Sequence, residues 1–179
     1  MAKDRKQLTV CPSLCPIVFM SDVPLWILIG LPGSGKSTWA ERFVQGDLPL
    51  LMISTDQIRA QLYGDAATQG AWPQIWQRVQ QRFRYGAIET QQGKVGGVLY
   101  DATNTRRRWR REIIQTAREI GYNRVLALWF DIPLACCVQR NHLRSRQVPL
   151  EVIHTMSRQL AGAPPHCDEG FDAVFQIRI

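Results

Sequence analysis

The sequence feature that most constrains the fold is the stretch Gly30-Leu31-Pro32-Gly33-Ser34-Gly35-Lys36-Ser37. It fits the pattern G-x-x-x-x-G-K-[ST], in which backbone N–H groups of a glycine-rich turn point at a phosphate. The apolar run 25–29 before it is typical of a buried parallel strand, and residues 38–44 carry apolar side chains at helical spacing. A chance match in a tight turn is the alternative, but this context predicts a nucleoside triphosphate site.

The chemistry of this loop follows from its residue types. Lys36 is expected to reach the β- and γ-phosphates, and the Ser37 hydroxyl is expected to bind Mg²⁺. The N-terminus of the following helix adds a positive dipole end. We therefore predict ATP or another nucleoside triphosphate and Mg²⁺ as cofactors. The predicted nucleotide-binding residues here are Gly30, Pro32, Gly33, Ser34, Gly35, Lys36, Ser37 and Thr38.

Strands and helices alternate along the chain, which predicts a mostly parallel five-stranded α/β sheet with helices on both faces. The predicted strands are 25–29, 50–53, 96–101, 125–130 and 173–179, and the predicted helices are 38–44, 55–64, 72–88, 109–120, 134–149 and 150–160. The length of 179 residues suits one such domain, at 24–179. Residues 140–149 are expected to form a helical lid on this P-loop NTPase fold.

Residues 1–23 are expected to be a loosely ordered leader or the product of a wrongly assigned start codon. Pro12 and Pro16 interrupt the mildly apolar run there, which argues against a signal peptide. No apolar run approaches the roughly 20 residues that span a bilayer, so no membrane contact is predicted. Five cysteines, with Cys136 next to Cys137, suggest reduced thiols, a cytoplasmic setting and no structural zinc.

The formal net charge is +7, which is unusual for an enzyme that acts on small neutral substrates. A surface of this charge attracts polyanions such as nucleic acid, although it also serves ordinary solubility. The run 106–111 is either a patch that tracks phosphates or a solvated helix start. Trp72 and Trp76, with Arg78 nearby, are either helix-packing residues or side chains that bind a single strand.

Charged residues lie at the carboxyl ends of two predicted strands, at the edge where open α/β sheets bind ligands. Asp101 ends the third strand, as the acidic residue of a Walker B segment does. Asp56 follows the second strand, and Arg59 lies one helical turn later on the same face. The pair is either a helix cap with an ion pair or a base that orients a hydroxyl beside a cation that holds an anion.

Another basic cluster precedes Pro149 and consists of Arg140, Arg144 and Arg146. Guanidinium groups at this place suit a lid that closes over a triphosphate and neutralises negative charge on the phosphoryl group that is being transferred. The other interpretation is a basic surface helix.

At these residues the chain resembles the P-loop polynucleotide 5′-kinases of the adenylate-kinase-like type, such as the phage end-healing kinase and the kinase modules of bacterial RNA-repair enzymes. The matching motifs are residues 30–40, Asp56-x-x-Arg59, Asp101-Ala102-Thr103-Asn104, Asp131-Ile132-Pro133 and the lid between Arg140-Asn141 and Val148-Pro149. The resemblance covers about residues 24–160. No motif anchors residues 61–92, where the acceptor specificity is expected to lie.

The resemblance implies ATP-dependent transfer to the 5′-hydroxyl end of RNA or DNA. It implies that Lys36 is catalytic, that Asp56 is the general base and that Arg59 holds the neighbouring phosphate of the strand. Arg144 would be the lid arginine, although the lid is slightly shorter than in the phage enzyme and Arg146 competes for this role. The resemblance further places Arg140 at the nucleotide, Asp101 beside Ser37 at the metal, and Thr103 and Asn104 at the substrate.

Two other functions remain compatible with the sequence. One is a small-molecule kinase for a nucleoside, sugar or antibiotic, because one P-loop scaffold serves many acceptors. The other is a nucleotide-dependent nucleic-acid-binding module without transfer activity. Asp56 and the lid arginines argue against the second, since a module that only binds needs neither.

Overall fold

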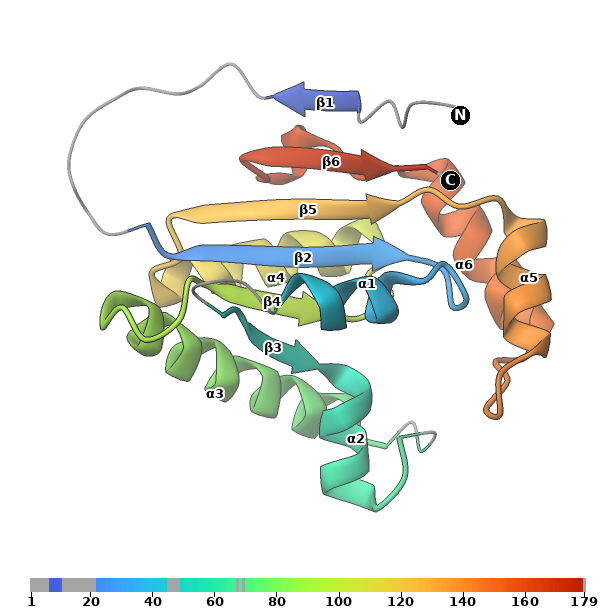
Figure 1. The fold of residues 1–179 in the computed structure, drawn as a ribbon, viewed down its shortest axis with the longest axis horizontal. Coiled ribbons are helices and arrows are strands. Elements are labelled where there is room, and N and C mark those ends of the chain that lie inside the picture. Colours follow the sequence, from blue (N-terminus) through green and yellow to red (C-terminus); the bar gives the residue numbers. More distant parts are fainter. Residues whose placement is uncertain (1–6, 11–21, 45–48, 67, 69, 179) are drawn as a thin grey trace.

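The structure is a computed structural model that describes residues 7–10, 22–44, 49–66, 68 and 70–178. Its strands form one sheet in the order β1-β6-β5-β2-β4-β3, and in Figure 1 helix α1 lies in front of this sheet and α4 behind it. The strands are β1 Gln7–Val10, β2 Pro24–Gly30, β3 Leu51–Ser54, β4 Val98–Asp101, β5 Arg124–Phe130 and β6 Ala173–Ile177. Strands β2 to β6 pair in parallel, which confirms the predicted α/β sheet.

Strand β1 was not predicted, because it falls in the segment 1–23 that was expected to be a loose leader. It pairs antiparallel with β6 and extends the sheet at that edge (Figure 1). Residues 1–6 and 11–21 of the same segment lie outside the described residues. Most of the stretch 46–49, where Gly46, Asp47 and Pro49 predict a turn, also lies outside them.

The described residues contain six α-helices and one short 3₁₀ helix. They are α1 Lys36–Phe43, α2 Thr55–Tyr63, α3 Trp72–Gln91, α4 Arg107–Ile120, α5 Leu134–His142, α6 Leu150–Gly162 and η1 Cys167–Glu169. Helix α2 begins where the sequence predicts, because the Ser54 side chain accepts a hydrogen bond from the Gln57 N–H. It ends at Gly64, whose φ of 77° suits glycine.

Burial explains why the central strands read as continuous apolar runs. Leu25, Ile27, Leu28 and Ile29 of β2 are all fully buried, since β2 lies between β4 and β5 with helices on both faces. Helix α3 packs through residues spaced three and four apart. The apolar spacing of the sequence predicts Ile88 on the same buried face, but Ile88 is 50% exposed because it lies one residue past Ala87 and so about 100° further around the helix.

The strand order brings the carboxyl ends of β2, β3 and β4 together. The chain passes from β2 to β3 and returns to β4 between them, and Ser54 pairs in register with Asp101. The loop after β2, the helix after β3 and the end of β4 therefore meet at one edge of the sheet. This is the edge where open parallel sheets bind ligands.

Two predictions about the remaining segments are wrong. The helix expected to run through residues 134–149 ends at His142, and residues 143–149 form a loop instead. Cys136 and Cys137 are free thiols, as expected, but Cys167 is disulfide-bonded, so the cysteines are not all reduced. The cytoplasmic setting stays a prediction. In the described ranges, no helix has both the length and the apolar character of a membrane span.

Candidate active site

The glycine-rich loop between β2 and α1 is shaped by backbone conformations that only glycine adopts easily. Gly33 and Gly35 have φ of 80° and 87°. A Cβ atom on Gly33 would run into the carbonyl oxygen of Cys137 on α5, so the loop also needs glycine for space. Gly35 begins α1, and within the described residues no side chain caps this helix. Its first N–H groups are therefore available to an anion.

Lys36 is the cation at the centre of this loop. Its side chain is buried, and burial lowers the pKa of its ammonium group below the ordinary lysine value. The negative charges of Asp101 and Asp56 act in the opposite direction, and the positive charge of Arg144 adds to the lowering. Lys36 thus lies among charged groups from β4, α2 and the loop after α5. A bound phosphate would give its ammonium the counter-charge that burial otherwise makes costly.

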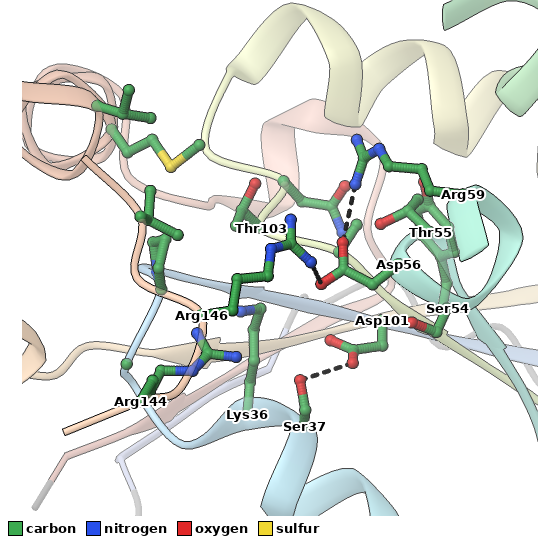
Figure 2. Close-up of a pocket in the computed structure, with 18 of the residues that line it drawn as sticks. Lys36, Ser37, Ser54, Thr55, Asp56, Arg59, Asp101, Thr103, Arg144 and Arg146 are labelled. Atoms are coloured by element: carbon green, nitrogen blue, oxygen red, sulfur yellow. Dashed lines mark hydrogen bonds and ion pairs between the residues drawn. The ribbon is translucent and has the colours of Figure 1, made fainter. Parts of the chain in front are cut away.

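Ser37 and Asp101 meet beside Lys36, as the sequence predicts for a magnesium site. The Ser37 hydroxyl donates a hydrogen bond of 2.8 Å to Asp101 Oδ2 (Figure 2). Asp101 Oδ1 is buried and has no hydrogen-bond partner among the described residues. Hydroxyl and carboxylate oxygens are ligands that Mg²⁺ prefers. In the part of the chain that the structure describes, no group of three or more His, Cys, Asp or Glu could hold a metal. The Ser37 hydroxyl and the Asp101 carboxylate fit an ion whose other ligands would be phosphates and water.

Asp56 lies in the first turn of α2, between two arginines. Its Oδ1 accepts a hydrogen bond of 2.8 Å from Arg59 Nη1, and its Oδ2 lies 3.6 Å from Arg146 Nη1 (Figure 2). The Asp56 side chain is 53% exposed, so the carboxylate opens into a cavity and is not packed in the core. The Asp56–Arg59 pair expected from the sequence exists, and the contact with Arg146 was not predicted.

The loop 143–149 carries two arginines over the cavity because its ends are joined by one buried side chain. Asn141 accepts a hydrogen bond of 3.0 Å from the Val148 N–H and donates one of 2.9 Å to the Val148 carbonyl. In Figure 2, Arg144 extends toward Lys36, whereas Arg146 extends toward Asp56. Of the two arginines that competed for the lid role, Arg144 is the one whose charge acts on the P-loop lysine.

The segment after β4 supports the P-loop from behind. The Gly30 N–H donates to the Thr103 carbonyl at 3.0 Å, and the Asn104 side-chain amide donates to the Leu28 carbonyl at 2.7 Å. Asn104 is buried with a φ of 49°, a strained conformation for a residue other than glycine. Asn104 was predicted to bind substrate; its amide holds the strand that precedes the P-loop, the residue also lines the cavity, and the substrate role stays a prediction. Thr103 lines the cavity.

The basic run 106–111 divides into residues with different environments. Arg110 is fully buried and forms two hydrogen bonds with Glu169, of 2.7 and 2.6 Å. It also donates to the Thr105 carbonyl at 2.9 Å, and Arg107 pairs with Asp168 at 2.7 Å. Arg110 therefore fixes the segment after β4, and neither interpretation of the run, as a phosphate patch or a solvated face, applies to it.

One cavity of about 820 Å³ unites these groups. The predicted residues that line it are Pro32, Gly33, Gly35, Lys36, Ser37, Thr38, Asp56, Arg59, Asp101, Thr103, Asn104, Arg140 and Arg144. Gly30 and Ser34 were also predicted as nucleotide-binding residues, but they lie behind this lining. The Gly30 N–H donates a hydrogen bond to the segment that follows β4, and Ser34 is buried.

Sequence reasoning missed several cavity residues, among them Tyr100, Trp109, Val152 and Met156. The spacing of Trp109 with Ile113 and Ala117 in the sequence predicts that it lies on the packed face of its helix. A usable signal was its place in the first turn of α4, because helices that follow the carboxyl ends of parallel strands begin beside the ligand site. Val152 and Met156 carry no sequence signal that separates them from ordinary helix packing.

Comparisons with known proteins agree with this geometry. Residues 25–163 match the AAA domain family AAA_33. A comparison with curated proteins found no match. A chain of the Pnkp1/Rnl/Hen1 RNA repair complex is 26% identical, with a TM-score of 0.64 over 80% of this chain and 45% of its own. This chain thus spans less than half the length of that one.

Two smaller structures share the fold at lower identity. A sugar kinase from Janibacter sp. is 18% identical, with a TM-score of 0.56 over 88% of this chain and 84% of its own. The tunicamycin resistance protein of Deinococcus radiodurans is 17% identical, with a TM-score of 0.50 over 79% of this chain and 82% of its own. Likeness at this level shows the fold alone. The comparisons together show a P-loop kinase fold.

Proposed function

The chain belongs to the AAA_33 family of AAA domains and has a P-loop kinase fold, and from this premise we propose that it phosphorylates the 5′-hydroxyl end of RNA or DNA. The donor is ATP or another nucleoside triphosphate. One observation carries the proposal: the Asp56 carboxylate, between Arg59 and Arg146, opens into the cavity that Lys36 lines. A carboxylate beside a phosphate-binding loop is what an enzyme needs to activate a hydroxyl, and a module that only binds nucleotide has no use for it.

In this proposal the residues that line the cavity have distinct roles. Lys36 and Arg144 hold the phosphoryl group that is transferred, and Arg140 lies beside the nucleotide. When bound at Ser37 and Asp101, Mg²⁺ neutralises charge on the phosphates. Asp56 accepts the proton of the attacking hydroxyl as its oxygen forms a bond to phosphorus and the bond to the departing diphosphate breaks. Thr103 lines the cavity and contacts the acceptor there.

Arg59 supports a polyanionic acceptor. Its Nη1 is bonded to Asp56, while its Nε is buried and without a hydrogen-bond partner within the described residues. Buried polar atoms left in this way are uncommon except where a ligand or ordered water completes them. The phosphate next to the 5′-terminal sugar would satisfy it, since guanidinium groups recognise phosphate through paired N–H donors. The positive net charge of +7 adds a general attraction for a strand.

The experiment is phosphate transfer from γ-labelled ATP with Mg²⁺ to 5′-hydroxyl RNA and DNA oligomers, with nucleosides and sugars in parallel. We expect label on the oligomers and a loss of rate as salt rises, because phosphate contacts release counterions. Label on nucleosides or sugars alone would overturn the polynucleotide assignment. It would favour the small-molecule kinase, the second candidate, to which the fold of the sugar kinase from Janibacter sp. gives support. Nucleotide binding with no transfer to any acceptor would favour the binding module.

A further inference from the structure

Three tryptophan side chains from two helices stack in one wall of the cavity. Trp72 and Trp76 lie one turn apart on α3, with ring centroids 6.3 Å apart and an angle of 12° between their planes. Trp109 of α4 stacks on Trp72, with ring centroids 5.5 Å apart and an angle of 10°. All three line the cavity that Asp56 and Arg59 also line. We call this set the tryptophan wall.

Trp72 and Trp76 are half-buried and pack against the hydrophobic core, whereas the core between α3 and α4 is filled without Trp109. Ile75 and Val79 of α3 and Ile113 and Ala117 of α4 already fill the core positions of the two helices and are buried. Trp109 is 39% exposed, although it precedes Ile113 by one helical turn. An indole that only filled the core would lie under other side chains, as Phe83 does further along α3. Trp109 is therefore the member of the tryptophan wall that presents exposed aromatic surface at the cavity.

The Trp109 ring already carries a planar group. The Arg106 guanidinium lies 4.8 Å from its centroid, in the geometry of a cation–π contact. The Arg106 side chain is exposed, so another planar group can take its place without unfolding anything. A stacking surface beside guanidinium groups is the combination that binds nucleotides in single strands, with the base on the aromatic ring and the phosphate on the cation.

We infer that the tryptophan wall is a subsite for the nucleobase of the acceptor, and specifically for the base of the 5′-terminal nucleotide of a strand. This inference rests on the proposed function, because it places the base relative to a hydroxyl at Asp56 and a phosphate at Arg59. It narrows the acceptor class: the molecule whose hydroxyl receives the phosphate is used best when it carries a planar ring near that hydroxyl. A sugar without a base would leave the wall unused.

The sharpest test changes the substrate and leaves the protein intact. Two oligomers are compared that differ only in the 5′-terminal nucleotide, which in one lacks its base. We expect the abasic end to lower kcat/KM for phosphate transfer by about 5- to 150-fold, the range that base–aromatic stacking gives. Equal kcat/KM values for the two oligomers would overturn the inference.

Variants then assign the effect to Trp109. In Trp109→Ala, kcat/KM on the normal oligomer should fall by a similar factor, while the abasic oligomer should lose nothing further, because the contact is already absent. Trp109→Phe should keep part of the preference. The matched control is Tyr85→Ala, which removes a 55% exposed aromatic ring elsewhere on α3. A full preference for the normal end in Trp109→Ala would overturn the assignment.

Arg106→Ala distinguishes the contribution of the Trp109 ring to base binding from that of the guanidinium that lies over it. If the indole holds the base, this variant keeps the difference between the normal and abasic ends. Loss of the difference in Arg106→Ala, with its persistence in Trp109→Ala, would mean that the guanidinium holds the base and would overturn the inference. Thermal unfolding of each variant reports whether a change in kcat/KM comes from lost structure.

Failure of the proposed function has a different signature. If wild-type protein phosphorylates no oligomer, the proposed function fails whatever the terminal base. The wall is then tested with the acceptors that are used: nucleosides preferred over ribose, with the preference lost in Trp109→Ala, would place a base on the wall without a strand. Use of both acceptors alike would overturn the wall as well.

Discussion

The cavity has two walls that are built in different ways. The phosphate wall consists mostly of main-chain groups, from a glycine-rich loop with φ values that suit only glycine and from the N-terminus of α1. One buried lysine adds the only side chain that we assign to it. The acceptor wall is side chain: Asp56 and Arg59 from α2, the tryptophan wall from α3 and α4, and Arg146 from the loop after α5. A wall of main chain requires particular residues at fixed spacing, whereas a wall of side chains requires only that several helices meet.

This difference predicts how the two walls respond to substitution. Changes in the phosphate wall should affect donor and acceptor together, because nothing is transferred without the bound phosphates. Changes in the acceptor wall should leave nucleotide binding intact. Substitutions that change acceptor use without changing nucleotide binding would show that the two walls act separately, and substitutions that change both would show that they act as one.

The largest effect is expected for Asp56→Asn. The amide cannot accept the hydroxyl proton, so kcat for phosphate transfer should fall by about 10²- to 10⁴-fold, the usual contribution of a general base. The Kd for ATP, measured by calorimetry, should stay close to the wild-type value. Asp22→Asn is the matched control, since its carboxylate accepts a 2.8 Å hydrogen bond from Arg124 near the start of β5. A large rise in the Kd for ATP in Asp56→Asn would mean that Asp56 serves the nucleotide or the metal.

Lys36→Met should come next, with a loss of about 10²- to 10³-fold in kcat, as when one preorganised donor to a developing charge is removed. Here the Kd for ATP should also rise, in contrast to Asp56→Asn. Lys94→Met, which removes a 59% exposed lysine, tests whether loss of charge alone matters. Normal ATP binding in Lys36→Met would contradict the assignment of the buried lysine to the phosphates.

Arg59→Ala should have a smaller effect that is confined to the acceptor. Losing one charge-assisted contact to phosphate should raise the KM for oligomers by about tenfold to a hundredfold. The slope of log KM against log salt should also become shallower, because one phosphate contact is gone. Arg124→Ala, which breaks an ion pair of the same 2.8 Å length near the start of β5, is the matched control. An unchanged acceptor KM with normal turnover would refute the assigned role.

How much the sequence could predict follows the same division. The P-loop, the five parallel strands and the contact of Ser37 with Asp101 were all predictable, because each depends on a local pattern or on strand order. The Arg146–Asp56 contact and the stacking of Trp109 on Trp72 were not, since they depend on how α3, α4 and the lid loop approach one another. Arg110 shows the limit clearly: Arg106, Arg108 and Arg111 of the same run are exposed, whereas Arg110 is buried against Glu169, which lies 59 residues later in the sequence.

The smallest effect concerns the pH dependence of nucleotide binding. Burial lowers the pKa of Lys36 below 10.5 in the free protein, and a bound triphosphate would raise it again by supplying negative charge. Between these two pKa values binding takes up a proton, so the affinity for ATP should fall as pH rises, by at most about tenfold per pH unit.

The stability of the free protein should change in the opposite direction across the alkaline window below pH 10.5. The folded pKa of Lys36 is the lower one, so the unfolded chain binds more protons there and the free energy of unfolding rises with pH. Calorimetric titrations with ATP above about pH 8, where the phosphates are fully ionised, would measure the binding part. Lys36→Met should flatten both dependences and Lys94→Met should not. A wild-type affinity independent of pH in this range would mean that the buried ammonium does not hold the phosphates, and the phosphate wall would then depend on its backbone alone.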